Sequence, residues 1–243
     1  MNHELFKLAC DTVIHNTKLE DSIGTLSEKT IHAVIKNYLE PDTSFHELKV
    51  KNYYADICTP DGIIEIQTRN FDKLRRKLDV FLEISPVTIV YPIAYHKWLR
   101  WVNNESGEVS SPRKSPKKGV PYLIFPELYK IKNYLLHPNI RFLILLINVE
   151  EYRYLDGWSK DKKKGSTRCD GIPLELIDEI SINSIDDYIK LLPSNLPVNF
   201  TTKDYSIATK TTRRISTVGL NILHHTGAIK RIGKEKNSYL YTK

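Results

Sequence analysis

Two strand-like runs of apolar residues, 53–59 and 62–68, carry polar residues at intervals. A period of two is typical of strands that bury one face. Between the runs, residues 59–62 read Thr-Pro-Asp-Gly, with Pro and Gly in turn positions, which predicts an antiparallel hairpin. The facing pairs would be Cys58 with Ile63, Ile57 with Ile64, and Asp56 with Glu65.

Helical patterns lie on both sides of this hairpin. In residues 27–39, and again in 71–83, apolar residues recur every three or four positions, so one face of each helix would be buried. Asn70 stands where a helix-capping side chain is expected. The predicted buried faces are Ile31, Val34, Ile35, Tyr38 and Leu39 in the first helix, and Phe71, Leu74, Leu78 and Phe81 in the second.

Further strands complete the pattern. Residues 47–50 form a short strand candidate, and 87–91 and 141–149 are apolar runs of the kind buried on both faces of a sheet. The order helix, three strands, helix, strand predicts an α/β fold in which a mixed sheet is flanked by helices.

The predicted hairpin sets Asp56 opposite Glu65 on one sheet face, with Gln67 two residues further along that face. Like charges in facing positions are destabilising, so the pair needs an explanation. A bound divalent cation supplies one, because Mg²⁺ is held by one or two carboxylates plus water and substrate phosphate. Glu28 lies three residues before Ile31, at the edge of the buried face of the first helix, so it is a third carboxylate directed toward the sheet. With Thr25 it also fits a capping box. Both roles, site residue and helix cap, stay open.

A helix Glu, a strand Asp, a turn and then Glu-x-Gln on the next strand resemble the PD-(D/E)xK, or restriction-endonuclease-like, nuclease superfamily over about residues 25–93. The resemblance implies hydrolysis of DNA phosphodiester bonds with Mg²⁺ (or Mn²⁺) as cofactor. It implies that Asp56 and Glu65 are catalytic metal ligands and that Glu28 supports the metal site. Gln67 would be catalytic in the position of the family Lys.

Gln67 departs from the family pattern, because Gln lacks the charge with which Lys activates water or stabilises the phosphate. Some restriction enzymes of the superfamily carry Gln there. Lys49 or Lys51, on the adjacent predicted strand, would then supply the missing charge.

Positive charge is concentrated at the end of the chain. Residues 201–243 hold nine Lys and Arg against two acids, whereas the preceding 200 residues hold 27 of each. The whole formal net charge of +7 therefore lies in this tail, which predicts a nucleic-acid partner. Two prolines in residues 191–199 indicate a linker.

The tail resembles a winged helix-turn-helix. Thr202 is expected to cap a helix over 203–209, a turn at 210–211 leads to a second helix over 212–225, and Gly227 ends it. A hairpin with its tip at 233–238 would follow. Residues expected inside the second helix are Ile215, Val218, Ile222 and Leu223. Residues expected to contact DNA are Thr211, Thr212, Arg213, Arg214 and Thr217 in the major groove, with Lys234 and Lys236 on phosphate.

Two basic loops interrupt the neutral part of the chain. Residues 111–118 contain four cations, and residues 158–168 contain five cations and one acid. Aromatic residues lie near both loops, a combination that suits a nucleic-acid groove as well as a solvated loop. The candidate DNA contacts are Lys117 and Lys118 in the first loop, and Lys162, Lys163 and Lys164 in the second.

Composition bears on where the protein is located. No stretch approaches the roughly 18–20 continuous apolar residues needed to span a membrane, and the start of the chain lacks a secretory signal pattern. The three scattered cysteines do not form a disulfide framework. These features predict a cytoplasmic protein without a membrane partner.

We therefore expect a nuclease domain (1–190), a linker (191–200) and a winged helix-turn-helix domain (201–243). The expected function is that of a metal-dependent deoxyribonuclease acting on DNA, mainly duplex. A non-catalytic DNA-binding regulator built on a degenerate nuclease fold is the alternative, and a protein-docking role for the tail is a third reading. The oligomeric state stays open, a homodimer included.

Overall fold

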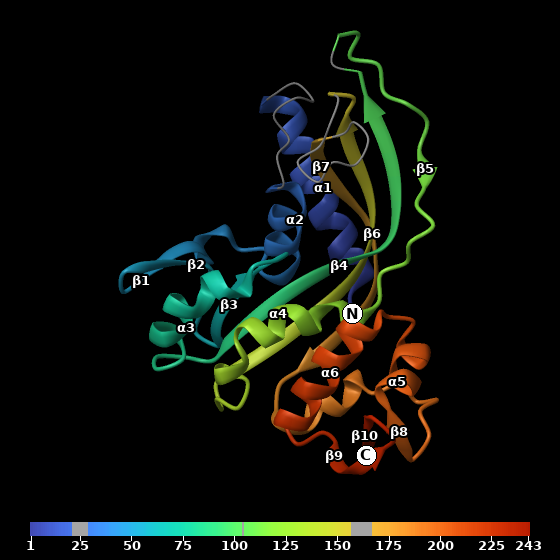
Figure 1. Cartoon of the computed structure of the whole chain (residues 1–243). Coiled ribbons are helices and arrows are strands. Elements are labelled where there is room, and N and C mark those ends of the chain that lie inside the picture. The colour runs from blue at the N-terminus through green and yellow to red at the C-terminus, as the bar shows by residue number, and fades with distance from the viewer. Residues whose placement is uncertain (21–28, 104, 157–166) are drawn as a thin grey trace. The chain divides into compact units, whose positions relative to one another are not determined.

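The chain is a mixed α/β protein with a large mixed sheet flanked by helices (Figure 1). Its structure, a computed structural model, describes residues 1–20, 29–103, 105–156 and 167–243. The hydrogen-bonded strand order of the large sheet is β1-β2-β3-β4-β6-β7, with β5 paired to β4, and a second sheet has the order β8-β10-β9. This arrangement confirms the predicted α/β class.

The chain divides into two compact units. Unit 1 comprises residues 1–46, 94–119 and 146–178, and unit 2 comprises residues 47–93, 120–145 and 179–243. Three long strands contribute residues to both units: β4 (Val87–Val102), β6 (Ile140–Tyr154) and β7 (Thr167–Ile182). The sequence predicted only residues 87–91 of β4 and 141–149 of β6, because polar and charged residues interrupt the apolar pattern beyond these runs.

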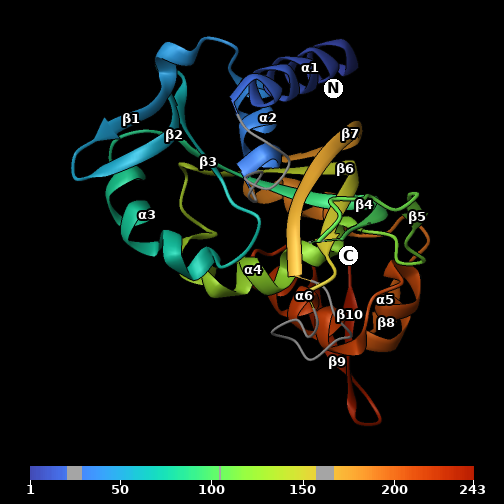
Figure 2. The ribbon, with the colours of Figure 1, turned by 90° about the horizontal axis from the view of Figure 1, so that it is seen from above.

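Unit 1 also holds the helices α1 (His3–Glu20) and α2 (Lys29–Leu39), the short 3-10 helix η1 (Thr43–Phe45) and the strand β5 (Arg113–Lys114). The two helices pack against each other (Figure 2). Between them the rings of Phe6 and Tyr38 meet edge to face, with centroids 5.3 Å apart. The strand β5 lies inside the segment predicted as a basic loop.

The remaining elements belong mainly to unit 2. Its strands are β1 (His46–Val50), β2 (Tyr53–Thr59), β3 (Gly62–Ile66), β8 (Asn199–Thr201), β9 (Lys230–Glu235) and β10 (Ser238–Thr242). Its α-helices are α3 (Arg75–Phe81), α4 (Phe125–Lys130), α5 (Thr202–Thr209) and α6 (Arg213–His225). Its 3-10 helices are η2 (Phe71–Leu74), η3 (Pro121–Ile124), η4 (Lys132–Tyr134) and η5 (Ile185–Leu191).

The hairpin β2–β3 has the predicted register, with Ile57 facing Ile64 and Cys58 facing Ile63 in antiparallel pairing. On its other side β3 pairs in parallel with β4. Gly62 is required at the start of β3, because a Cβ there would lie 2.7 Å from the Pro86 carbonyl oxygen. The hairpin is thus fixed in the sheet between β1 and β4.

The helix after the hairpin buries the face that the sequence predicts. Phe71, Leu74, Leu78 and Phe81 are all buried. Asn70, however, was wrongly predicted as its cap. It has a left-handed backbone conformation (φ 61°) and makes no capping hydrogen bond through its side chain.

In the tail, α5 and α6 are followed by the β9–β10 hairpin, as the sequence predicts. Its tip is shorter than the predicted 233–238, because β9 extends to Glu235 and β10 begins at Ser238. Two further details differ. The cap of α5 is Thr201, which forms a capping box with Asp204, one residue earlier than predicted. The buried face of α6 is Ser216, Gly219, Leu220, Ile222 and Leu223, so Ile215 and Val218 lie at its edge.

A chain of hydroxyl groups fixes the turn between α5 and α6. The Thr211 hydroxyl lies 2.8 Å from that of Thr209 and 2.9 Å from that of Ser216. Ser216 is buried and Thr211 is half-buried. Thr211 therefore stabilises the turn through its hydroxyl group, and its expected contact with DNA stays a prediction.

The tail packs against α4 within unit 2 (Figures 1 and 2). A Cβ on Gly219 would lie 2.7 Å from the Phe125 ring, so the helix and the ring meet at van der Waals distance. Lys132 donates a hydrogen bond of 2.9 Å to Asn221 beside this contact. Residues 201–243 thus share their packing with residues 120–145.

Candidate functional site

The carboxylate of Asp56 lies where the β2–β3 ladder ends. Paired backbone positions stop at Ile57 and Ile64, and beyond them the Ile66 N–H donates to Asp56 Oδ2 at 2.7 Å. The side chain thus takes the place of a backbone acceptor and is directed toward β3. The paired register ends before Asp56 and Glu65, so the predicted facing pair is not part of the ladder; the two side chains still interact, because the charge of Asp56 raises the pKa of Glu65.

Glu65 is a buried acid on β3, with a relative exposure of 2%. Both of its oxygens accept hydrogen bonds from the Lys77 ammonium, at 3.0 and 2.8 Å. Lys77 precedes the buried Leu78 on α3, which sets it at the border of the helix's apolar face. The cation on Glu65 therefore comes from α3, whereas Lys49 and Lys51 are exposed.

Burial and the charge of Asp56 raise the pKa of Glu65 and the Lys77 ammonium lowers it, and together they set that pKa at about 7. Desolvation disfavours the charged form of an acid, and a second carboxylate acts in the same direction. The ion pair with Lys77 offsets only part of this cost. A strongly perturbed acid beside a second acid is a feature of functional sites, although structural ion pairs produce it as well.

Two carboxylates are a sufficient protein ligand set for Mg²⁺, which keeps several waters. Within the described residues, groups of three or more His, Cys, Asp and Glu placed to hold a metal are absent. The residues present thus fit a magnesium ion held by Asp56 and Glu65 alone. Such an ion would have to displace Lys77 from at least one Glu65 oxygen.

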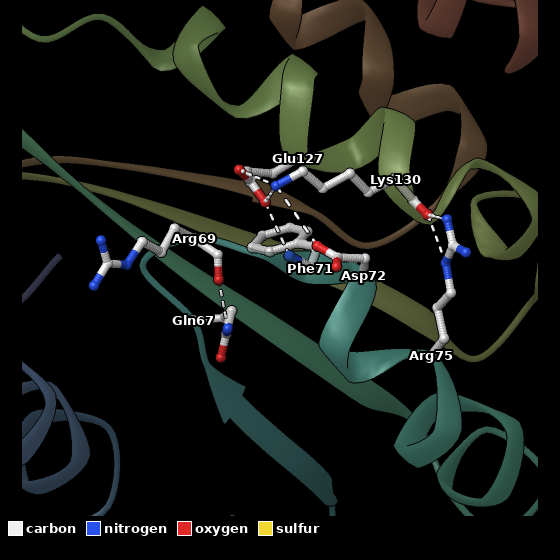
Figure 3. Close-up of polar contacts among 7 residues, drawn as sticks. All are labelled: Gln67, Arg69, Phe71, Asp72, Arg75, Glu127 and Lys130. Atoms are coloured by element: carbon white, nitrogen blue, oxygen red, sulfur yellow. Dashed lines mark hydrogen bonds and ion pairs between the residues drawn. The ribbon is translucent and has the colours of Figure 1, made fainter. Parts of the chain in front are cut away.

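Gln67 follows β3 directly, and its amide is engaged locally (Figure 3). The Nε2 atom donates to the Arg69 carbonyl oxygen at 2.5 Å, and the backbone N–H donates to Val90 at 2.9 Å. The side chain therefore stabilises the segment that leads into η2.

Glu127 on α4 provides the cap that Asn70 does not. Its Oε2 accepts the Phe71 N–H at 2.9 Å, and its carboxylate also pairs with Lys130 at 2.9 Å (Figure 3). Arg75 in turn donates to the Lys130 carbonyl oxygen at 2.8 Å through Nε. These contacts tie α4 to the helix that carries Lys77.

The predicted DNA contacts of the tail form an exposed set. Thr212, Arg213, Arg214 and Thr217 are exposed in the first turns of α6, and Lys234 and Lys236 are exposed on the β9–β10 hairpin. Thr212 also caps α6. The Arg231 guanidinium lies 3.7 Å from the centre of the Tyr239 ring, and the Lys234 ammonium lies 5.3 Å from it, so the hairpin carries ordered cations.

The other candidates lie in unit 1 or outside the described residues. Lys117 and Lys118 are exposed, and the Lys118 ammonium lies 4.2 Å from the centre of the Tyr95 ring. Glu28, Lys162, Lys163 and Lys164 fall outside the described residues.

The structure thus defines a mixed α/β protein in which a buried acid of the sheet, Glu65, pairs with Lys77 from α3. The chain belongs to the family described as "Domain of unknown function (DUF8091)", which matches residues 29–183. It is similar to an uncharacterized protein of Treponema pallidum (strain Nichols), with 29% identity over 184 residues, covering 75% of this chain and 73% of that protein. No solved structure matches the chain. Its described helices are all too short or too polar to cross a membrane.

Proposed function

We propose that this chain is a metal-dependent DNA endonuclease with a restriction-endonuclease-like fold and a winged helix-turn-helix tail. The observation that carries the proposal is the electrostatic interaction of Asp56 with the buried Glu65 at the end of the β2–β3 ladder. Like charges that lie close together are destabilising, and a cation bound between them would offset that cost. The pairing with Lys77 adds a cation to the same place.

In this mechanism Asp56 and Glu65 would hold Mg²⁺ or Mn²⁺. The bound ion would lower the pKa of a coordinated water and neutralise charge on the scissile phosphate. Lys77, which pairs with Glu65, would supply the positive charge that Gln67 lacks. Gln67 keeps the segment after β3 in position through Arg69.

The tail provides the duplex affinity. Arg213 and Arg214 begin α6 and are exposed, so they fit contacts to base edges and phosphates in the major groove. Lys234 and Lys236 on the hairpin fit phosphate contacts beside them. A DNA-binding tail would bring the substrate to the catalytic residues.

A cleavage assay tests the proposal on supercoiled, linear duplex and single-stranded DNA, with Mg²⁺, with Mn²⁺ and with EDTA. Cleavage should need the metal, and Asp56→Asn and Glu65→Gln should each reduce it about 100-fold or more, because each removes a metal ligand. The exposed acid Glu83 gives a matched control, since Glu83→Gln removes the same charge from the helix end. Cleavage that survives in the two site variants would contradict the assignment.

A non-catalytic DNA-binding regulator is the second candidate. It is favoured by the engagement of Gln67 with the Arg69 carbonyl and by the occupation of both Glu65 oxygens by Lys77. In that case the wild-type chain binds duplex DNA in the same assay and cleaves none of the three substrates with either metal.

A further inference from the structure

A basic segment of unit 1 is fixed along one side of β4. The strand β5 lies beside β4 and pairs with it in antiparallel register, with Trp98 facing Lys114 (Figure 1). Five residues further along, the Gly119 N–H donates to the Tyr95 carbonyl oxygen at 2.9 Å. Both ends of residues 114–119 are therefore held on the same strand, and the lysines between them have defined positions.

Three aromatic rings follow one another along this part of β4. The ring centroids of Tyr95 and His96 lie 4.7 Å apart, and those of His96 and Trp98 lie 6.1 Å apart, both in edge-to-face geometry. All three residues are half-buried. We call Tyr95, His96 and Trp98 the ring row; each of its members keeps part of its surface in contact with solvent.

Two exposed lysines of the basic segment lie over the ring row. The Lys118 ammonium lies 4.2 Å from the centre of the Tyr95 ring, and the Lys114 ammonium lies 5.4 Å from that of the Trp98 ring. Desolvation and the charges of Lys114 and Lys118 lower the pKa of His96, because nearby cations disfavour the imidazolium form. Both ammonium groups therefore also act on the middle ring of the row.

The positive charge of these two lysines is not neutralised by an acid. Another cation of β4, Arg100, is paired with Glu150. Lys114 and Lys118 make cation–π contacts and, within the described residues, no ion pair. A ring holds an ammonium group in place without cancelling its charge. Both lysines thus keep a full charge for a negatively charged partner.

Rings and charged lysines in one row fit single-stranded nucleic acid. Its bases stack on aromatic side chains while its phosphates contact cations. A duplex buries the faces of its bases in the helical stack and presents only their edges in the grooves, so it cannot use the rings in this way. An isolated phosphate would use the lysines and leave the rings without a role.

We propose that Tyr95, His96 and Trp98, with Lys114 and Lys118, form a binding surface for single-stranded nucleic acid in unit 1. A base takes the exposed ring face, and the ammonium group that lay there contacts the adjoining phosphate. Stacking is the stronger of the two ring contacts, so the exchange is favourable. The surface is separate from the proposed cleavage site, and its test needs no metal.

Fluorescence anisotropy in EDTA tests the surface with a labelled oligothymidine and with a blunt duplex of the same length. The wild type should bind the single strand. Trp98→Leu should weaken single-strand binding about tenfold, because it removes one stacking ring, and should leave duplex affinity unchanged. Trp101→Leu removes another half-buried Trp of β4 and should bind both ligands like the wild type. Circular dichroism verifies that both variants are folded.

The charge is tested by a variant that leaves the sheet intact, since Lys118 is exposed. Lys118→Gln should weaken single-strand binding and make its salt slope shallower by up to about 0.7, the contribution of one phosphate in a single strand. Lys7→Gln is the matched control, because it removes one exposed cation from α1 in the same unit. Its salt slope should equal that of the wild type.

A wild-type chain that does not bind oligothymidine would overturn the proposal, and so would wild-type affinity in both Trp98→Leu and Lys118→Gln. Equal losses in Trp98→Leu and Trp101→Leu, or equal losses of single-strand and duplex binding, would overturn it as well, because neither result is specific to the ring row. A loss confined to the single strand and to the ring-row variants supports it. Oligouridine in the same assay then distinguishes RNA from DNA as the preferred strand.

Discussion

Lys77 donates to both carboxylate oxygens of Glu65, at 3.0 and 2.8 Å, from a helix on the far side of the turn that follows β3. A buried charge is tolerated in a protein only when it is paired and hydrogen-bonded. Lys77 therefore stabilises an ionised Glu65, and it occupies the same oxygens that a metal would use. The ion pair links the stability of the fold to the proposed chemistry.

Competition between Lys77 and a metal gives the first prediction. Mn²⁺ should raise the melting temperature of the wild type, because a ligand that binds the native state stabilises it. Lys77→Gln should show a larger rise at the same Mn²⁺ concentration and slower cleavage, since the competing ammonium is also the proposed catalytic cation. Glu65→Gln should show no rise. Equal shifts in melting temperature in all three proteins, measured by thermal unfolding, would show that the metal does not bind at this site.

The second prediction concerns pH. The pKa of Glu65 is about 7 in the folded chain against an ordinary value of 4.5, so the folded state keeps a proton that the unfolded state loses. The resulting stabilisation is complete below pH 4.5 and is lost as the pH rises through 7. At about 1.4 kcal/mol per pKa unit, the loss amounts to a few kcal/mol.

Urea unfolding in EDTA between pH 4.5 and pH 8 measures this effect. The wild type should lose more stability over that range than Glu65→Gln, whose amide does not titrate. The comparison cancels the contributions of the other acids, which are common to both proteins. Parallel pH profiles would show that Glu65 is ionised throughout.

Gln67 leads to the third prediction. Its amide donates to the Arg69 carbonyl oxygen, and a Lys ammonium can make the same contact. Gln67→Lys should therefore fold like the wild type and keep or raise cleavage. Gln67→Leu should lose the hydrogen bond and about 1 kcal/mol of stability. A fully folded Gln67→Lys chain that loses cleavage would show that the site is tuned to the amide.

The fourth prediction divides DNA binding between the tail and the rest of the chain. Each phosphate contact contributes a slope of about −0.9 to the plot of log affinity against log salt concentration. Arg213→Ala and Arg214→Ala should each weaken duplex binding and make the slope shallower by up to that amount. Lys190→Ala removes one positive charge before the tail and serves as the control. Fluorescence anisotropy across a salt series measures both the duplex affinity and its salt slope. Unchanged slopes in the Arg variants would show that α6 does not contact the duplex.

The sequence predicted those features that short-range chemistry determines. The β2–β3 register follows from period-two alternation and a Pro-Gly turn, and the structure confirms it. The buried face of residues 71–81 follows from helical spacing. Both patterns lie within a few neighbouring residues, so a single sequence suffices to read them.

The partners of the site could not be predicted in the same way. Lys77 reaches Glu65 across 12 residues of sequence, and Glu127 caps Phe71 across 56. Neither contact leaves a local pattern, because each depends on how α3 and α4 pack in unit 2. In the sequence, Lys77 is one of several cations on one face of a predicted helix. Lys49 and Lys51 were chosen as the source of the missing positive charge because they lie on the adjacent predicted strand.

The packing of the tail on α4 supplies the last prediction. In an open helix, Gly→Ala stabilises by about 1 kcal/mol, because Ala is the better helix former. Gly219→Ala should instead destabilise by about 1–3 kcal/mol, because the new methyl group would lie 2.7 Å from the Phe125 ring.

Gly233 in β9 is the matched control, since a Cβ there meets nothing within 4 Å. Gly233→Ala should leave stability close to that of the wild type. Urea unfolding of both variants measures the difference. If Gly219→Ala were neutral or stabilising, α6 would not press on Phe125, and residues 201–243 would behave as a module that separates freely from α4.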